Sequence, residues 1–300
     1  MHFVNILRTK TAYIYQKNGV LSLVEASLVI AKNQKNFTTT LYVVEDFYNP
    51  FSGRAEMPGF EDEKQLKTEE IMTILDKKMA QELLNNGRNH VIIPDFVTEI
   101  GEGAFKECRE LISVVIPKSV TKIGMNAFAF CEGLTSVVIP NSVTEIEDGA
   151  FNVCCELQSV VIPDSLIEIS KFNFYYCEKL RSIAVGKNNP RYDSRGDCNA
   201  IIETVTNTLI KGCSGTIIPD TVTKIGERAF DNCRGLTYVT IPKSVTKIEE
   251  RAFLHCDDLK FVNIENSEIQ IEKYAFCRCR NISEESKKRL KELGYDFDEE

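Results

Sequence analysis

The sequence predicts an α/β solenoid, a stack of short coils that each add one strand to a parallel β-sheet. Three observations support this prediction. Prolines recur every 23 residues, first at Pro94, Pro117, Pro140 and Pro163 and later at Pro219 and Pro242. Apolar residues keep the same spacing around these prolines. Each repeat also opens with a short β-branched stretch such as LTSVVIP, residues 134–140, which is typical of a strand that a proline ends.

Seven repeats align when they start at positions 91, 114, 137, 160, 216, 239 and 262. The aligned repeats share four apolar columns. Isoleucines form the first column: Ile100, Ile123, Ile146, Ile169, Ile225, Ile248 and Ile271. Phenylalanines form the second: Phe105, Phe128, Phe151, Phe174, Phe230, Phe253 and Phe276. Cysteines form the third: Cys108, Cys131, Cys154, Cys177, Cys233, Cys256 and Cys279. Leucines and one isoleucine form the fourth: Leu111, Leu134, Leu157, Leu180, Leu236, Leu259 and Ile282. Alanine precedes the phenylalanine in every repeat except one, where Asn173 replaces it.

A unit of 23 residues cannot bury these side chains by itself, so neighbouring coils must cover one another. Each buried apolar side chain contributes roughly 1.5–3 kcal/mol, whereas ordering the backbone of one residue costs about 1–2 kcal/mol. We therefore expect single coils to be unfolded and the array to fold cooperatively. After its strand, each coil must turn and return, and the segment DGAFNVC, residues 148–154, is expected to form a helical or 3₁₀ turn with Ala150 and Phe151 inside.

The cysteine column has three interpretations. Buried thiols are favoured, because free cysteine behaves as a small apolar residue. Disulfides between coils are less favoured, because stacked side chains point in parallel and seven is an odd number. A metal site is the weakest alternative, because no second CxxC and no histidine pair stands at zinc spacing. A ladder of unpaired thiols indicates a reducing compartment.

Both ends of an open stack require caps. Residues 1–90 are expected to cap the first coil as an α+β region rather than to form an independent small domain, with strands at 3–7, 12–16, 20–30 and 39–47, an irregular segment at 49–60 and then a helix. In that helix Met72, Leu75, Met79 and Leu83 form one apolar stripe, and Gly87 would follow it. At the other end, residues 284–300 are expected to form a capping helix and an acidic tail. Ser283 is the expected N-cap of this helix, and Gly294 its end.

Composition and motifs indicate no chemistry. A net charge of −8 and a pI near 5.2 disfavour nucleic-acid and anionic-membrane partners. The first thirty residues lack the pattern of a signal peptide, and we expect no membrane span. The chain has three histidines and lacks phosphate-loop, GxSxG and HExxH motifs. His255 next to Cys256 is the one candidate nucleophile pair, but neighbouring side chains diverge and Cys256 belongs to the buried column. We expect no enzyme activity, no metal and no cofactor.

The repeat pattern LxxVxIPxSVTxIGxxAFxxCxxL resembles that of the BspA-like leucine-rich repeat family. The resemblance covers residues 91–283 and includes the proline, isoleucine, alanine-phenylalanine, cysteine and leucine columns. It implies a right-handed leucine-rich repeat array with a concave parallel β-sheet, and binding rather than catalysis. Many members are bacterial surface proteins, and those studied are often adhesins that contact host matrix proteins.

Residues 183–215 form one longer repeat, which resembles the hairpin-bearing island repeat of the same family. The segments AIIE and TLIK are expected to pair around a turn at residues 205–207. The island also contains Arg195, Gly196 and Asp197, an integrin-type tripeptide. So short a match arises readily by chance, and we interpret it as a turn.

The candidate binding surface follows from strand alternation. If Val137 and Ile139 point into the core, Ser136 and Val138 point outward. The outward positions change from valine and serine to other residues near the C-terminal end, where aromatic side chains suit a protein contact. The predicted contact residues are Val115, Val138, Val161, Ile217, Tyr238, Thr240, Phe261 and Asn263. The alternative is that the valines serve strand formation only.

The sequence therefore predicts a non-enzymatic interaction module that binds a protein or peptide on the concave face of a capped solenoid. The alternative function is a bacterial cell-surface adhesin. We expect a cytoplasmic monomer, with export to the cell surface as the alternative location.

Overall fold

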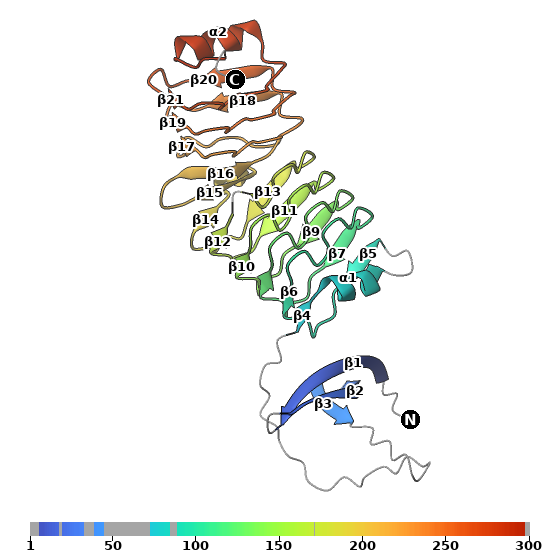
Figure 1. Ribbon diagram of the computed structural model, residues 1–300. Coiled ribbons are helices and arrows are strands. Elements are labelled where there is room, and N and C mark those ends of the chain that lie inside the picture. Colours follow the sequence, from blue (N-terminus) through green and yellow to red (C-terminus); the bar gives the residue numbers. More distant parts are fainter. Residues whose placement is uncertain are drawn as a thin grey trace, which may run out of the picture. The chain divides into compact units, whose positions relative to one another are not determined.

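The computed structural model describes residues 6–17, 20–32, 39–44, 73–84, 89–170 and 172–297. The chain divides into two compact units, Met1–Thr68 and Glu69–Glu300 (Figure 1). The expected boundary at residue 90 thus falls inside the second unit, which includes the strand and helix that precede the first repeat.

The first unit contains a three-stranded antiparallel sheet. Its strands are β1 (Ile6–Lys17), β2 (Val20–Lys32) and β3 (Thr39–Val44), in the order β1-β2-β3. Residues 6–7 and 12–16, which we expected in two separate strands, lie in the single strand β1. The irregular segment expected after β3, together with Met72 and Gly87, lies outside the described residues.

The second unit is a parallel β-solenoid of about eight turns. The longer strands of its first half form one five-stranded parallel sheet, in which each strand pairs with the one 23 residues later. They are β5 (His90–Ile92), β7 (Ser113–Val115), β9 (Ser136–Val138), β11 (Ser159–Ile162) and β13 (Ser182–Val185). We call the exposed side of these strands, together with that of the longer strands of the second half, β18 (Tyr238–Ile241) and β20 (Phe261–Ile264), the long-strand face.

A second parallel sheet runs along the other side of the same coils. It contains the two-residue strands β4 (Ile74–Leu75), β6 (Glu99–Ile100), β8 (Lys122–Ile123), β10 (Glu145–Ile146) and β12 (Glu168–Ile169). The charged residues before the isoleucines pair with one another, with Lys122 between Glu99 and Glu145. Lys122 Nζ lies 3.4 Å from Glu145 and 2.6 Å from Glu147.

The alanine-phenylalanine segments form turns rather than helices. Ala150 N donates to Glu147 O and Asn152 N to Gly149 O, so each bond closes a single turn. Gly149 and Val153 both have positive φ, 66° and 56°, which ends the turn after a few residues. The helical part of the expected α/β class is therefore confined, among the described residues, to two short helices at the ends of the solenoid and one 3₁₀ turn.

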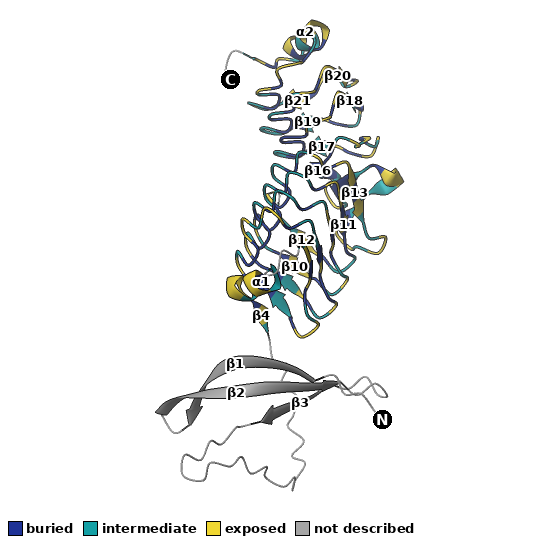
Figure 2. Cartoon of the chain, turned by 90° about the vertical axis from the view of Figure 1, so that its right-hand side faces the viewer, coloured by how far each residue is buried: buried dark blue, intermediate teal, exposed yellow. Residues whose placement is uncertain are grey.

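The core is built from the predicted columns (Figure 2). The phenylalanine rings stack in two runs: Phe105, Phe128, Phe151 and Phe174 lie 5.1 to 5.8 Å apart, and Phe230, Phe253 and Phe276 lie 4.8 and 5.0 Å apart. Asn173 is fully buried, and its side chain bonds to the preceding coil: Oδ1 accepts from Ala150 N at 2.9 Å and Nδ2 donates to Ile146 O at 3.3 Å. The polar exception in the alanine column thus joins two coils.

The island lies between the two runs of rings. It consists of β14 (Tyr192–Asp193), a 3₁₀ turn (Arg195–Asp197), β15 (Ala200–Glu203) and β16 (Thr208–Gly212). β15 and β16 are antiparallel, which confirms the predicted hairpin. β16 also pairs in parallel with β17 (Lys224–Ile225), and the sheet continues through β19 (Lys247–Ile248) and β21 (Gln270–Ile271).

The island divides the core in two. Ile201 packs with the N-terminal cluster, whereas its neighbour Ile202 packs with the C-terminal cluster. At Gly212, an added Cβ would lie 2.2 Å from the Phe230 ring, so only glycine lets the second run of rings start against the hairpin. The longer strands of the second half, β18 (Tyr238–Ile241) and β20 (Phe261–Ile264), form a separate two-stranded parallel sheet.

Helices close both ends of the solenoid. The expected first helix was placed too early: α1 is Lys77–Leu84, and Leu75 lies in β4, where it pairs with Ile100 and extends the isoleucine column. Asp76 Oδ1 accepts from Met79 N at the start of α1. α2 is Glu284–Glu292, and Ser283 caps it as predicted. Beyond α2, Tyr295 Oη accepts from Phe276 N, and its ring covers the last phenylalanine at 5.5 Å.

Candidate partner-binding surface

The outward side chains of the first sheet form an apolar column on the long-strand face. Parallel pairing places Val115 beside Val138, and Val138 beside Val161. Their side chains are 55, 70 and 48% exposed, whereas Val114, Val137 and Val160 on the same strands are buried. Strand alternation thus sorts each valine pair as the sequence predicted.

A column of small polar residues accompanies these valines. Ser113, Ser136, Ser159 and Ser182 are neighbours in the pairing of β7, β9, β11 and β13. His90 leads this column, and its Nδ1 lies 2.7 Å from Ser113 Oγ. Hydroxyls beside exposed methyl groups give this part of the face both hydrogen-bonding and apolar contacts.

The C-terminal candidates lie on the two-stranded sheet. Tyr238 pairs with Phe261, and Thr240 pairs with Asn263. Tyr238 and Phe261 are 53 and 48% exposed. Thr240 Oγ1 donates to Tyr238 Oη at 2.8 Å, which holds the phenol ring along the strand. Two large rings side by side among polar groups form the most aromatic part of the long-strand face.

Ile217 belongs to neither group. It is 76% exposed but lies outside any strand, and its N–H donates to Cys198 O in the island at 3.1 Å. Thr216 Oγ1 also donates to the island, at Asn199 O. The eight predicted residues therefore form two separate patches and one isolated side chain, because the island takes the hydrogen bonds that a continuous sheet would use.

The integrin-type tripeptide forms a turn whose arginine is held within the molecule. Arg195 Nε and Nη2 lie 2.9 and 2.8 Å from the carboxylate of Asp193. Arg195 Nη1 donates to Asn207 Oδ1 and to Thr221 Oγ1. Gly196 and Asp197 have positive φ, 65° and 52°. The guanidinium braces the hairpin instead of projecting from it.

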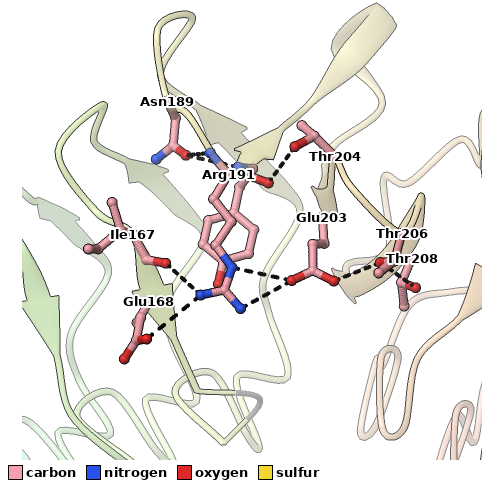
Figure 3. A network of polar contacts seen from close by, with 9 residues as sticks. Ile167, Glu168, Asn189, Arg191, Glu203, Thr204, Thr206 and Thr208 are labelled. Carbon is pink, nitrogen blue, oxygen red and sulfur yellow. Dashed lines mark hydrogen bonds and ion pairs between the residues drawn. The ribbon is translucent and has the colours of Figure 1, made fainter.

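β12 is the last strand of the second sheet, and beyond it a polar network at the island takes the place of strand pairing (Figure 3). Arg191 donates through Nε and Nη2 to Glu203 Oε1 and through Nη1 to Ile167 O. Glu203 also accepts from Thr206 Oγ1. The hydrogen bond from Thr206 is the main cause of a lowered pKa of Glu203. The hydrogen bonds from Arg191 lower this pKa further, so the carboxyl group stays ionised.

A second network joins the two halves near the phenylalanine columns. Arg228 Nη1 donates to Tyr175 Oη at 2.9 Å and to Asp231 Oδ2 at 2.7 Å. The Arg228 guanidinium also lies over the Tyr175 ring, 5.2 Å from its centroid. Burial, followed by the charge of Asp231, raises the pKa of Tyr175 to about 12, so the phenol stays protonated. Sequence inspection missed both networks, because no regular spacing relates their members.

The cysteine column is a ladder of thiol donors. Cys131 Sγ donates to Phe105 O at 3.1 Å, and Cys154, Cys177, Cys256 and Cys279 each repeat this bond to the phenylalanine carbonyl 26 residues earlier. Burial raises the pKa of Cys177 to about 12. Cys256 has its pKa raised by burial too, while the His255 ring lies 3.5 Å from Arg278 Nη1. The candidate Cys/His pair therefore has a thiol bonded to a main-chain carbonyl and no activated thiolate.

Within the described ranges, no group of three or more histidine, cysteine, aspartate and glutamate residues is placed to hold a metal ion. The same part of the chain contains no helix with the length and apolarity of a membrane span.

Comparisons with known proteins identify the family of the repeats. The family model described as BspA type leucine rich repeat region matches residues 84–195 and 207–296 in six copies. No curated protein matches the chain. The pneumococcal vaccine antigen PcpA has a similar structure, with a TM-score of 0.51 and 16% identity over 87% of this chain and 72% of that one.

Two further crystal structures align less closely. A leucine-rich repeat protein from Eubacterium ventriosum is 21% identical over 65% of this chain and 71% of that one, with a TM-score of 0.45. The T. pallidum leucine rich repeat protein is 25% identical over 69% of this chain and 84% of that one, with a TM-score of 0.43.

Proposed function

The chain belongs to the BspA type leucine-rich repeat family, and from this premise we propose that it is a non-enzymatic module that binds a protein or peptide on its long-strand face. Proteins of this family are generally non-catalytic and typically bind other proteins. The resemblance stated above also leads us to infer a right-handed coil with the long strands on the concave side.

One observation carries the proposal: Tyr238 and Phe261 lie side by side on adjacent strands, and each side chain is about half exposed. Exposed aromatic side chains on a rigid sheet provide large contact area at small conformational cost, which is typical of residues that dominate binding energy. The exposed valine column on the other side of the island is a second, separate apolar patch.

The experiment is affinity capture with the full chain, identification of the retained protein, and measurement of its affinity for substituted chains. Tyr238→Ala and Phe261→Ala are each expected to weaken binding by about 1–2 kcal/mol or more. Val205→Ala is the matched control, because Val205 is an exposed apolar side chain at the tip of the hairpin, outside the long-strand face. Equal affinity of all three variants and the unsubstituted chain would remove the proposal.

For location, we propose a reducing compartment, the cytoplasm. The support is the thiol ladder, in which disulfide formation would remove the hydrogen bonds to the phenylalanine carbonyls. Protease treatment of intact cells tests this proposal: peptides from residues 91–283 released into the medium would instead place the chain at the cell surface.

A further inference from the structure

The outward positions of the long strands carry no charged side chain. On the described strands β5, β7, β9, β11, β13, β18 and β20, these positions hold no lysine, arginine, aspartate or glutamate. In the first half they are serine, valine, isoleucine and alanine after an initial His90, and in the second half they are Tyr238, Thr240, Phe261 and Asn263. Charged residues make up 27% of the chain, so the long-strand face differs clearly from the average composition.

The second sheet of the same coils shows that stacking does not require uncharged outward positions. There the outward residues include Lys122, Glu145 and Lys247. Ion pairs hold these charges, since Lys122 Nζ lies 2.6 Å from Glu147 and Lys247 Nζ lies 2.6 Å from Glu272. The two sets of strands lie on opposite sides of the coils (Figure 1), and charge is absent from the outward positions of one set only. Strand formation therefore does not explain the absence.

Charged residues return directly beside the long strands. Lys260 precedes β20 and Glu265 follows it, and both are exposed. In the first half, the exposed Arg181 precedes β13. An apolar and aromatic centre without charge, surrounded by charges of both signs, is the composition of the centre and rim of a protein–protein interface. The arrangement favours a protein ligand over nucleic acid or an anionic surface, which would require basic residues at the centre.

Two columns on the long-strand face offer different contacts. Val115 lies beside Val138, and Ser136 lies beside Ser159, on strands about 4.8 Å apart. A ligand segment that crosses these strands meets methyl groups along one edge and hydroxyl groups along the other. A charged side chain of that segment would lose its water without gaining an opposite charge from an outward strand position, which is unfavourable.

We propose that the long-strand face binds a linear segment of a partner protein whose contacting side chains are uncharged. These side chains are apolar along one edge of the segment and carry hydroxyl or amide groups along the other. This inference rests on the proposed function and deepens it, since it states the chemistry of the partner. Affinity then comes from burial of apolar surface and from neutral hydrogen bonds, although the chain has a net charge of −8.

The first test introduces charge at one uncharged position. Asn263 is exposed on β20, and Gln270 is an exposed uncharged amide on β21 of the same coil, in the other set of strands. A displayed library of short random linear peptides is selected against the full chain, and the affinities of the selected peptides are then measured for substituted chains. Asn263→Glu and Asn263→Lys are both expected to weaken binding about tenfold or more, because neither charge finds a partner in the ligand.

Three controls separate charge from size and from position. Asn263→Gln has the size of the glutamate variant without its charge, and Gln270→Glu and Gln270→Lys add the same charges outside the long-strand face. Each control is expected to change affinity by less than about threefold. Far-ultraviolet circular dichroism confirms that all five variants are folded. Weakening by one sign of charge only, or equal weakening by Asn263→Gln, would overturn the inference.

A second measurement needs no protein variant. The selected peptides are expected to contain fewer acidic and basic residues than the unselected library. Their affinity should change by less than about threefold between about 0.05 and 0.5 M salt, because salt screens attraction between exposed charges and this contact has none. Failure to select any peptide, enrichment of charged residues or a steep loss of affinity with salt would overturn the inference. Charged peptides that are lost with Phe261→Ala would leave the proposed function intact and refute the uncharged partner alone.

Discussion

Replacing Asn173 with alanine would restore the uniform alanine column and yet destabilise the solenoid. The buried amide makes two hydrogen bonds to the preceding coil, to Ala150 N and Ile146 O. Each bond contributes about 1 kcal/mol, and a buried group left without its partner costs about 1–3 kcal/mol. Ala150 N keeps a second, longer contact with Glu147 O at 3.4 Å, which offsets part of the loss. We expect Asn173→Ala to lower the free energy of unfolding by about 2–4 kcal/mol.

Urea denaturation followed by circular dichroism measures this change. Asn152→Ala is the matched control. Asn152 directly follows Phe151 in the preceding coil, and its Oδ1 has no hydrogen-bond partner in the described structure. The control should change stability by less than about 0.5 kcal/mol. Asn173→Asp tests the direction in which stability changes with pH. A buried carboxyl must be protonated to donate to Ile146 O, so its pKa in the folded chain lies above the unfolded value of about 3.9. Its stability should then be retained below that pH and lost as pH rises through the folded pKa. An Asn173→Ala chain as stable as the Asn152→Ala chain would refute this account of the exception.

Four further outcomes follow from the geometry. Phe151→Ala should cost about 3–5 kcal/mol in urea denaturation, since its ring is fully buried between two others, whereas the partly exposed Phe172→Ala should cost much less; similar costs would contradict the ring stack. Gly212→Ala should destabilise the chain by about 1–3 kcal/mol because its Cβ meets Phe230, and Gly196→Ala, with open space around it, should cost less; the reverse order would show that backbone φ matters more than the contact. Glu147 has its pKa lowered first by its hydrogen bond with Lys122, so its contribution is complete above the unfolded pKa near 4.5 and is lost as pH falls through the folded value; Glu147→Gln should flatten the acid side of the melting-temperature profile, and an unchanged profile would argue against the ion pair. Cys177 should resist N-ethylmaleimide at pH 8 in the folded chain and react after denaturation, as mass spectrometry of peptides would show, because burial raises the pKa of its thiol to about 12; labelling of the folded chain would mean that the ladder opens.

The regular part of the fold could be predicted because each coil needs the same side chains at the same places. Phe128 and Phe151 must stack on each other, and this requirement is visible as a period in the sequence. Leu75 is the residue at which periodicity predicted the wrong element. A two-residue strand has no period of its own, and the spacing of Leu75, Met79 and Leu83 also fits a helix, so only the pairing of Leu75 with Ile100 distinguishes the two.

The candidate surface was predictable one strand at a time. Alternation correctly placed Val138 outside and Val137 inside. The break at Ile217 was not predictable, because its cause is the position of Cys198 and Asn199, and Asn199 adopts a positive φ of 54° that no local pattern announces.

The hairpin β15–β16 has a consequence for how such an array changes in length. Its strands present one face to each core, so Ile201 completes the stack before it and Ile202 starts the stack after it. Each half therefore has its own finished boundary. Insertion or deletion of one 23-residue coil away from the two coils that flank the island leaves the contacts of the other half unaltered, and the hairpin acts as a fixed reference point from which two segments can be lengthened independently during evolution or by design.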